Sequence, residues 1–233
     1  MLILPLEPAA LDAAIIDLDG TMVDTLGDFV EVLHRMLADL GLPPIAATEV
    51  ECMVGKGTEH LIQSVLDHLL ALSIPELAAR QVAVQALFPQ AWASYHQHYP
   101  TVNGQFSQVY PGVLEGLQAL RGWGLPLACL TNKPTAFAQA LLRAKGLEVF
   151  FTQVFGGDAF AKKKPDPLPL RKTCEALGTT PARTLVVGDS SNDAQAARAA
   201  GCPVVLVTYG YNHGQPVRQV DADGWIDTLA RLR

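Results

Sequence analysis

The sequence predicts an α/β fold in which a doubly wound parallel sheet carries an inserted all-helical domain. Five short apolar segments alternate with helical patterns, and several of these segments are apolar throughout rather than at every second position. Continuously apolar strands are typical of parallel sheets that helices cover on both faces. A long helical stretch separates the first two strands, and it is too long for an ordinary crossover connection.

Five segments are predicted as buried strands. They span residues 13–18, 125–130, 152–155, 183–188 and 203–207. Helical patterns lie between them or follow them, at 113–122, 134–145, 167–177, 192–200 and, at the C-terminus, near 224–231. This alternation of strand and helix predicts a Rossmann-like core.

The insertion is predicted to contain three helices. The first covers residues 25–41 and ends at Gly41, the second covers Thr58–Leu70, and the third begins with the capping-box spacing Ser73–Glu76 and continues to about Tyr99. We therefore expect a helical domain at 25–102 and a core formed by 1–24 and 103–233, with hinges near Asp24-Thr25 and Pro100–Gln105.

Composition limits the partners and the location. The chain has 233 residues and a formal net charge of −6, with no basic cluster beyond 162–164, which argues against a nucleic-acid partner. No apolar run approaches the roughly 18 residues of a membrane span. No Lys or Arg precedes Arg35, so no signal peptide is expected. Four cysteines without paired spacing are typical of reduced thiols in a cytoplasmic protein.

Two carboxylates, those of Asp17 and Asp19, follow the first predicted strand. Side chains two residues apart on a strand point the same way, so these like charges repel each other. A divalent cation would offset the repulsion, and a phosphate ligand would complete the charge balance. Gly20 and Thr21 turn the chain at this point, and a solvated Asp-Gly turn without function is the alternative interpretation.

Two further clusters follow predicted strands, at the edge where open α/β sheets bind ligands. Thr131-Asn132-Lys133 lies directly before a helix, and its hydroxyl and amide either form an anion site or cap that helix. Lys162-Lys163-Lys164 lies in a loop before Pro165, where a lysine can reach back over the sheet edge. A solvated basic patch is the alternative for the three lysines.

A third cluster, Gly188–Asp193, follows the strand at 183–188. Asp189 belongs to the same strand-end layer as Asp17 and can complete an oxygen-only site of the kind that Mg²⁺ prefers. Asp193 lies one helical turn further on, where it either supports this site or stabilises the helix N-terminus. Together the strand ends supply metal ligands, anion donors and a cation at one edge of one sheet.

These motifs resemble those of the haloacid dehalogenase-like superfamily of phosphotransferases. Asp17–Thr21 is similar to the first family motif, Thr131-Asn132 to the second, Lys164-Pro165 to the third and Gly188–Asp193 to the fourth. The resemblance covers nearly the whole chain, and the insertion at 25–102 is similar to the family's helical cap. Within the superfamily the chain looks most like bacterial phosphoglycolate phosphatases, on the segments 208–212 and 54–58.

The resemblance implies phosphoryl transfer in two steps. Asp17 would attack phosphorus, and Asp19 would protonate the leaving alcohol and then activate water. Mg²⁺ would be held by Asp17, the main-chain carbonyl of Asp19 and Asp189. The remaining implied roles are phosphate binding by Thr131, Asn132, Gly20 and Lys164, with Lys163 as the alternative lysine, and support of the metal site by Asp193 and Thr21.

The expected function is Mg²⁺-dependent hydrolysis of a small phosphate monoester, with 2-phosphoglycolate as the first candidate. Asp19 argues against dehalogenases, which lack this acid, and Gly188-Asp189 argues against sugar-phosphate mutases, which usually have Glu-Asp there. Lys56, on a cap loop, is a hypothetical partner of the substrate carboxylate, although an exposed loop lysine is equally compatible with the sequence.

Several alternatives stay open at this point. The chain can be a sugar-phosphate phosphatase, for example for an amino-sugar 6-phosphate, a phosphomutase, or a phospho-accepting receiver-like signalling domain. The expected partner is a small phosphate ester, without nucleic acid or membrane, and the expected assembly is a monomer or a homodimer.

Overall fold

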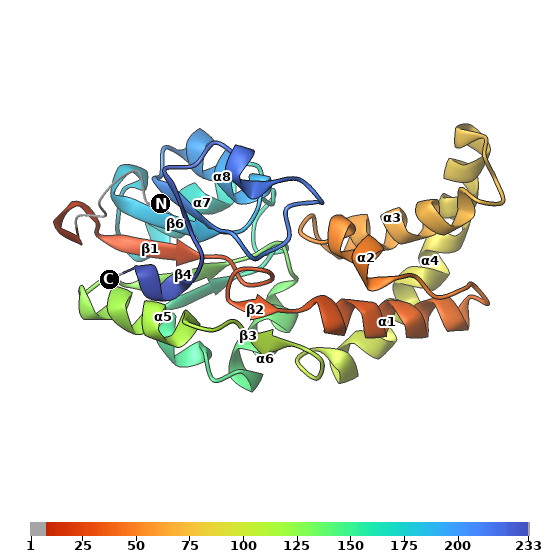
Figure 1. The fold of residues 1–233 in the computed structure, drawn as a ribbon, viewed down its shortest axis with the longest axis horizontal. Coiled ribbons are helices and arrows are strands. Elements are labelled where there is room, and N and C mark those ends of the chain that lie inside the picture. The colour runs from red at the N-terminus through yellow and green to blue at the C-terminus, as the bar shows by residue number, and fades with distance from the viewer. Residues whose placement is uncertain (1–7, 233) are drawn as a thin grey trace.

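The computed structural model describes residues 8–232. An α/β layer structure carries a separate block of helices, α1 to α4 (Figure 1). The sheet has six parallel strands in the order β5-β4-β1-β6-β7-β8. They are β1 (Ala13–Ile16), β4 (Leu127–Leu130), β5 (Gln153–Phe155), β6 (Thr184–Gly188), β7 (Val204–Val207) and β8 (Gly224–Ile226). The predicted doubly wound parallel sheet is therefore confirmed. Residues 1–7, for which no signal peptide is expected, lie outside the described residues.

Helices cover both faces of the sheet. The helices α5 (Val113–Gly122) and α6 (Thr135–Ala144) lie on one face, and α7 (Leu168–Leu177) and α8 (Ser191–Ala200) lie on the other (Figure 1). Ile16 packs toward the first pair and its neighbour Ile15 toward the second. Because successive residues of a strand point to opposite faces, both faces require apolar side chains, which explains the continuous apolar runs.

The helical block comprises α1 (Leu26–Asp39), α2 (Ala47–Met53), α3 (Thr58–Leu70) and α4 (Leu77–Val102), and it has its own apolar core. The helices α1 and α3 both pack against α4. Two short strands, β2 (Val23–Asp24) and β3 (Gln108–Val109), pair antiparallel where the chain leaves and re-enters the α/β part. The two connections between the parts therefore run side by side.

The predicted C-terminal helix near 224–231 is wrong. The chain instead forms strand β8 and then a short 3-10 helix at Leu229–Arg231. The spacing of Ile226, Leu229 and Leu232 is compatible with a helix, but the free edge of β7 offers backbone partners to 224–226. Pairing with β7 satisfies these groups while Ile226 and Leu229 stay buried.

Two features of the helical block also differ from prediction. The third predicted helix begins at Leu77 rather than at Ser73, because the Glu76 carboxylate accepts hydrogen bonds from the main-chain N–H groups of Ala78 and Ala79 and so provides the N-cap. The hydroxyl of Ser73 donates to the carbonyl of Leu70 at the end of α3 instead. The sequence also gives no sign of α2.

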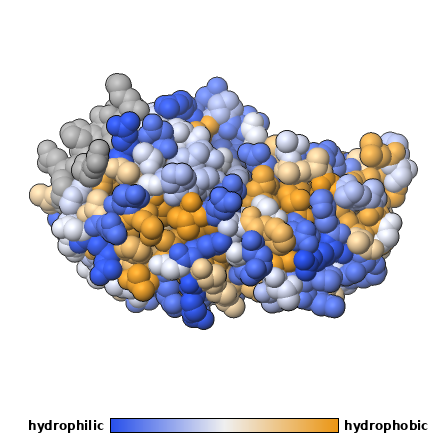
Figure 2. All heavy atoms as spheres, turned by 60° about the horizontal axis from the view of Figure 1, so that its bottom comes forward, coloured by the Kyte–Doolittle hydropathy of each residue, from blue (hydrophilic) through white to orange (hydrophobic). Residues whose placement is uncertain are grey.

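The surface carries apolar patches on both parts of the molecule, separated by polar side chains on the face shown in Figure 2. Exposed large apolar residues include Leu72, Leu77 and Val82 on the helical block and Val149 on the α/β part. The longest helix, α4, contains two prolines, and within residues 8–232 no helix has the length and hydropathy that crossing a bilayer requires.

Candidate active site

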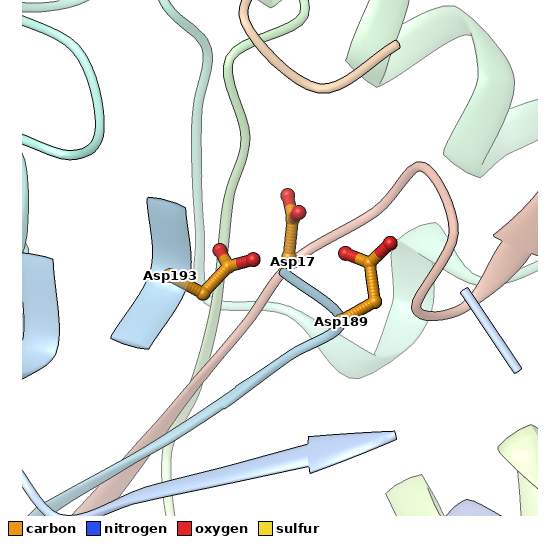
Figure 3. Close-up of side chains that lie close together, drawn as sticks. All are labelled: Asp17, Asp189 and Asp193. Carbon is orange, nitrogen blue, oxygen red and sulfur yellow. The ribbon is translucent and has the colours of Figure 1, made fainter. Parts of the chain in front are cut away.

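Three aspartates gather at the carboxyl edge of the sheet. Asp17 follows β1, Asp189 follows β6, and Asp193 lies in the first turn of α8. One carboxylate oxygen of each lies within 4.8 Å of the corresponding oxygens of the other two. Figure 3 shows the three side chains turned toward a common space. Parallel strands β1 and β6 are neighbours in the sheet, so their C-terminal residues meet at this edge.

Lys164 lies beneath these carboxylates. Its Nζ is 2.9 Å from Asp17 Oδ1 and 2.6 Å from Asp193 Oδ1, and it donates to the carbonyl of Leu130 at 2.9 Å. Burial alone would lower the pKa of this lysine, but the two carboxylates outweigh that effect and the pKa is raised. Lys163 is exposed, so the structure brings Lys164 and not Lys163 to Asp17.

The aspartates carry more negative charge than one lysine offsets. Burial, together with repulsion from Asp193 and against the attraction of Lys164, raises the pKa of Asp17 to about 7. Burial and repulsion from Asp193 and Asp17 raise the pKa of Asp189 as well. A bound cation would stabilise these buried carboxylates, because a nearby positive charge lowers the free energy of their ionised forms.

The donor set fits a hard divalent cation. Asp17 Oδ1 is buried and, among residues 8–232, has no aligned hydrogen-bond donor despite its proximity to Lys164. Asp189 accepts from the Thr21 hydroxyl at 3.2 Å and from the Tyr211 main-chain N–H at 2.5 Å, which fixes its carboxylate. Both oxygens of Asp193 are already engaged, by Lys164 and by Ser190. Asp17 and Asp189 are therefore the better ligands, and Asp193 orients Lys164.

Mg²⁺ is expected to raise the melting temperature of the protein. Saturation at a hundred times the dissociation constant contributes about 2.7 kcal/mol, which for a chain of this size corresponds to an increase of roughly 5–10 °C. The measurement is thermal unfolding with EDTA and with Mg²⁺. Asp189→Asn keeps the side-chain shape but removes a charge, so its shift should be close to zero. An equal shift in both proteins would contradict this metal site.

Gly20 and Gly210 allow the main chain to pass close to Asp189. A Cβ on Gly20 would lie 2.2 Å from Asp189 Oδ2, and its φ of +80° favours glycine. A Cβ on Gly210 would lie 2.3 Å from Asp189 Cβ and 2.4 Å from the carbonyl oxygen of Gly20. The position of Asp189 therefore depends on two glycines far apart in the sequence.

Gly210→Ala is expected to destabilise the fold. The new methyl group meets backbone and a buried side chain, so we expect a loss of about 1–3 kcal/mol in the free energy of unfolding. Gly122→Ala is the matched control, because its Cβ would have no neighbour within 4 Å. Denaturant titration of both variants tests this, and equal stabilities would contradict the contact at Asp189.

A small cavity opens beside the aspartates, between the sheet edge and the helical block. Its volume is about 40 Å³, and both parts of the molecule line it. From the α/β part come Asp17, Asp19, Thr131, Asn132, Lys133, Asp189, Ser190 and Tyr211, and from the helical block Phe29, Val54, Gly55, Gly57, Thr58, Leu61, Tyr95 and Tyr99. The cavity therefore lies over the predicted catalytic residues, between the two parts of the molecule.

Asp19 forms an ion pair inside this cavity that the sequence patterns do not predict. Its Oδ1 lies 3.0 Å from Nζ of Lys133, and the side chains of the two residues are 11% and 2% exposed. Lys133 directly follows the predicted pair Thr131-Asn132, which was its only signal in the sequence. Its Nζ also lies over the rings of Phe29 and Tyr99, at 4.7 and 5.1 Å from their centres.

A loop of the helical block closes over the cavity. The carbonyl oxygen of Gly55 accepts hydrogen bonds from the side-chain amides of Asn132, at 3.0 Å, and Asn192, at 3.2 Å. The Asn132 side chain also exchanges two hydrogen bonds with the main chain of Lys164. Asn132 therefore ties this loop and Lys164 together, and its side chain has no free donor directed at a phosphate. Thr131 lines the cavity.

Two predicted binding residues are not brought into the cavity. The main-chain N–H of Gly20 donates to the carbonyl of Val23, so this amide is engaged in a turn. Lys56 is absent from the lining although its neighbours Gly55 and Gly57 belong to it. It lies instead near His60 and His213, whose pKa values are lowered by burial and then by Lys56. Both flanking glycines have positive φ angles.

The fold and this site agree with a known family. Residues 11–201 match the family model of the haloacid dehalogenase-like hydrolases, and the chain belongs to this family. It is therefore an enzyme of the hydrolase class.

Its similar proteins include phosphoglycolate phosphatases. The chain is 43% identical to the phosphoglycolate phosphatase of Thiobacillus denitrificans, over 96% of this chain and 94% of the relative. It is 44% identical to the plasmid-encoded phosphoglycolate phosphatase of Cupriavidus necator, over 94% and 90%. A crystal structure described as a predicted phosphoglycolate phosphatase from Haemophilus somnus superposes with a TM-score of 0.87 at 34% identity and covers 96% of both chains.

Proposed function

We propose that the protein is a Mg²⁺-dependent phosphatase that hydrolyses 2-phosphoglycolate to glycolate and phosphate through an aspartyl-phosphate. The observation that carries this proposal is the buried Lys164, which bridges Asp17 and Asp193 beside Asp189 at the sheet edge. The names of the similar proteins support the substrate. Membership of a hydrolase family argues against the receiver-like alternative.

Asp17 acts as the nucleophile in this proposal. One carboxylate oxygen forms a bond to phosphorus, and the bond between phosphorus and the ester oxygen breaks. Lys164 and Asp193 hold the side chain of Asp17 in position, and its surroundings exclude all but a few water molecules. When bound, Mg²⁺ offsets the charge between the carboxylates and the phosphate.

Asp19 acts as acid and then as base. In the first step it protonates the departing alkoxide of glycolate. In the second step it takes a proton from the water that attacks phosphorus, the bond between phosphorus and the Asp17 oxygen breaks, and phosphate is released. The Thr131 hydroxyl is the proposed donor to an equatorial phosphate oxygen, since it lines the same cavity. Gly20 has no such role, because its amide donates within a turn.

Opening of a cap would admit the substrate. We propose that residues 25–102 form this cap and that 1–24 and 103–233 form the core. The hinges would lie at Asp24-Thr25 and Pro100–Gln105, next to the paired strands β2 and β3. The cavity of about 40 Å³ is small for a phosphate ester, so we expect the Gly55 loop to move when the substrate enters.

The expected location, partners and assembly are compatible with this function. We propose a cytoplasmic location, a small phosphate ester as the partner, and no nucleic-acid or membrane partner. The assembly is either a monomer or a homodimer.

A panel of phosphate esters tests the proposal. It contains 2-phosphoglycolate, an amino-sugar 6-phosphate, a hexose phosphate and p-nitrophenyl phosphate, assayed with Mg²⁺ and with EDTA. We expect Mg²⁺-dependent release of phosphate with the highest kcat/KM for 2-phosphoglycolate. A higher kcat/KM for a sugar phosphate would overturn the substrate, and full activity in EDTA would overturn the dependence on metal.

A further inference from the structure

We propose that Lys133, Tyr95 and Tyr99 form a carboxylate-binding subsite that selects esters of short hydroxy acids. The inference rests on the proposed phosphatase function and names the residues that recognise the leaving group. Lys133 comes from the α/β part and the two tyrosines from α4, so the subsite is complete only when the cap is closed.

Lys133 is the one Lys or Arg among the described residues that line the cavity. Its Nζ has three N–H donors, and within residues 8–232 a single one, directed at Asp19, has a hydrogen-bond acceptor. The rings of Phe29 and Tyr99 lie against the same group. Cation–π contacts hold the ammonium in place but leave hydrogen-bonding capacity for a ligand.

The hydroxyls of Tyr95 and Tyr99 are the second, independent observation. Both residues line the cavity and are at most 1% exposed, yet neither hydroxyl has a hydrogen-bond partner within the described part of the chain. Buried hydroxyls are normally paired, because leaving one unpaired costs roughly 1–3 kcal/mol. Two unpaired hydroxyls beside an incompletely paired ammonium indicate an acceptor-rich ligand.

A carboxylate fits this set of donors. It accepts at two oxygens with about four lone pairs and has no hydrogen to donate. A sugar hydroxyl would satisfy the donors only in part and would leave the charge of Lys133 without a second partner. The chemistry of the subsite therefore favours a hydroxy-acid ester over a sugar phosphate.

The position of Asp19 sets the length of the acid. A group that protonates the ester oxygen must lie within hydrogen-bond distance of it, and Lys133 Nζ lies 3.0 Å from Asp19 Oδ1. A short acid can therefore contact Asp19 and Lys133 at the same time. In 2-phosphoglycolate one methylene separates the carboxylate carbon from the ester oxygen, so a carboxylate bound to Lys133 stays near the oxygen that Asp19 protonates.

This assignment replaces Lys56 as the partner of the carboxylate. Lys56 lies outside the lining of the cavity and near two histidines. Lys133, by contrast, is enclosed together with the proposed acid, so recognition of the carboxylate and protonation of the leaving group occur side by side.

The test compares two substrates that differ in the carboxylate. One is 2-phosphoglycolate, and the other is ethyl phosphate, in which a methyl group replaces the carboxylate. Lys133→Met is expected to lower kcat/KM for 2-phosphoglycolate at least about 100-fold more than for ethyl phosphate, because a buried charge pair with the substrate is lost. Lys172→Met, on the exposed face of α7, is the matched control and should leave both values unchanged.

Tyr95→Phe and Tyr99→Phe provide a second test with intact rings and packing. At least one is expected to lower kcat/KM for 2-phosphoglycolate about 5- to 20-fold relative to ethyl phosphate, the effect of one lost hydrogen bond. Equal losses for both esters in all three variants would overturn the subsite, since Lys133 would then act only through Asp19. A wild-type enzyme that hydrolyses other esters but not 2-phosphoglycolate would instead overturn the proposed substrate, together with the subsite.

Discussion

Asp17→Asn is expected to reduce the rate of phosphate release by roughly four orders of magnitude or more, as removal of a nucleophile does in other covalent hydrolases. An amide is a poor nucleophile, but it has nearly the same shape as the carboxylate. Lys164 would keep its contacts with Asp193 and the carbonyl of Leu130. The measurement is kcat for 2-phosphoglycolate at saturating Mg²⁺.

The control for this variant is its stability. Because Asp17 is buried and its pKa is raised, loss of its charge should not lower the melting temperature in EDTA. An inactive, folded Asp17→Asn protein supports the nucleophile, whereas a folded variant that keeps more than about a hundredth of the activity contradicts it.

Asp19→Asn is expected to lower kcat for 2-phosphoglycolate about 10²- to 10⁴-fold, the usual contribution of a general acid and base. The amide oxygen introduced by this substitution can still accept a hydrogen bond from Lys133, so the ion-pair partner keeps a contact. For p-nitrophenyl phosphate, whose leaving group needs little protonation, the first step should stay fast and the second should become slow.

A burst of p-nitrophenol distinguishes this role from a structural one. Rapid mixing of Asp19→Asn with excess p-nitrophenyl phosphate should release up to one equivalent of p-nitrophenol per enzyme, followed by a slow steady state. If Asp19 served only to hold Lys133, the amide would largely keep that contact, both steps would change little and alike, and the substitution would create no burst.

Much of the α/β part could be predicted because its pattern is local. The continuous apolar runs around Ile15 and Val186 require two covered faces, and polar residues directly after them mark the edge that carries the site. The grouping of Asp17 with Asp189 follows from their positions directly after two buried parallel strands. The metal and the chemical steps stay predictions.

Elements that depend on distant partners could not be predicted. Strand β8 exists because β7 offers a free edge. The edge of β7 is not visible in the sequence around Ile226, where the spacing of apolar residues favours the wrong element. Helix α2 has a local partner in Glu49, but it follows Ala46, which lacks the capping side chain that usually marks a helix start. The main-chain N–H of Ala46 donates instead to the Glu49 carboxylate within the helix.

The surroundings of single side chains in the cavity could not be predicted from the sequence either. Lys133 gains its surroundings from Phe29 on α1 and from Tyr95 and Tyr99 on α4, which lie far away in the sequence. Lys56 is predicted to pair with the substrate carboxylate because it lies between two glycines on a cap loop. In the structure it is the carbonyl of Gly55 that contacts the core, through the side chain of Asn132. Gly55 and Gly57 line the cavity and Lys56 does not, and a contact of Lys56 with the substrate stays a prediction.

The central claim is that Asp17 carries the phosphoryl group between the two steps. The most direct measurement is mass spectrometry of Asp19→Asn, quenched in acid during turnover of p-nitrophenyl phosphate, with peptide mapping. The account predicts an added mass of one phosphoryl group on the peptide that contains Asp17, and no such addition in the Asp17→Asn, Asp19→Asn double variant. Turnover without a phosphorylated protein, or a phosphoryl group on another residue, would contradict it.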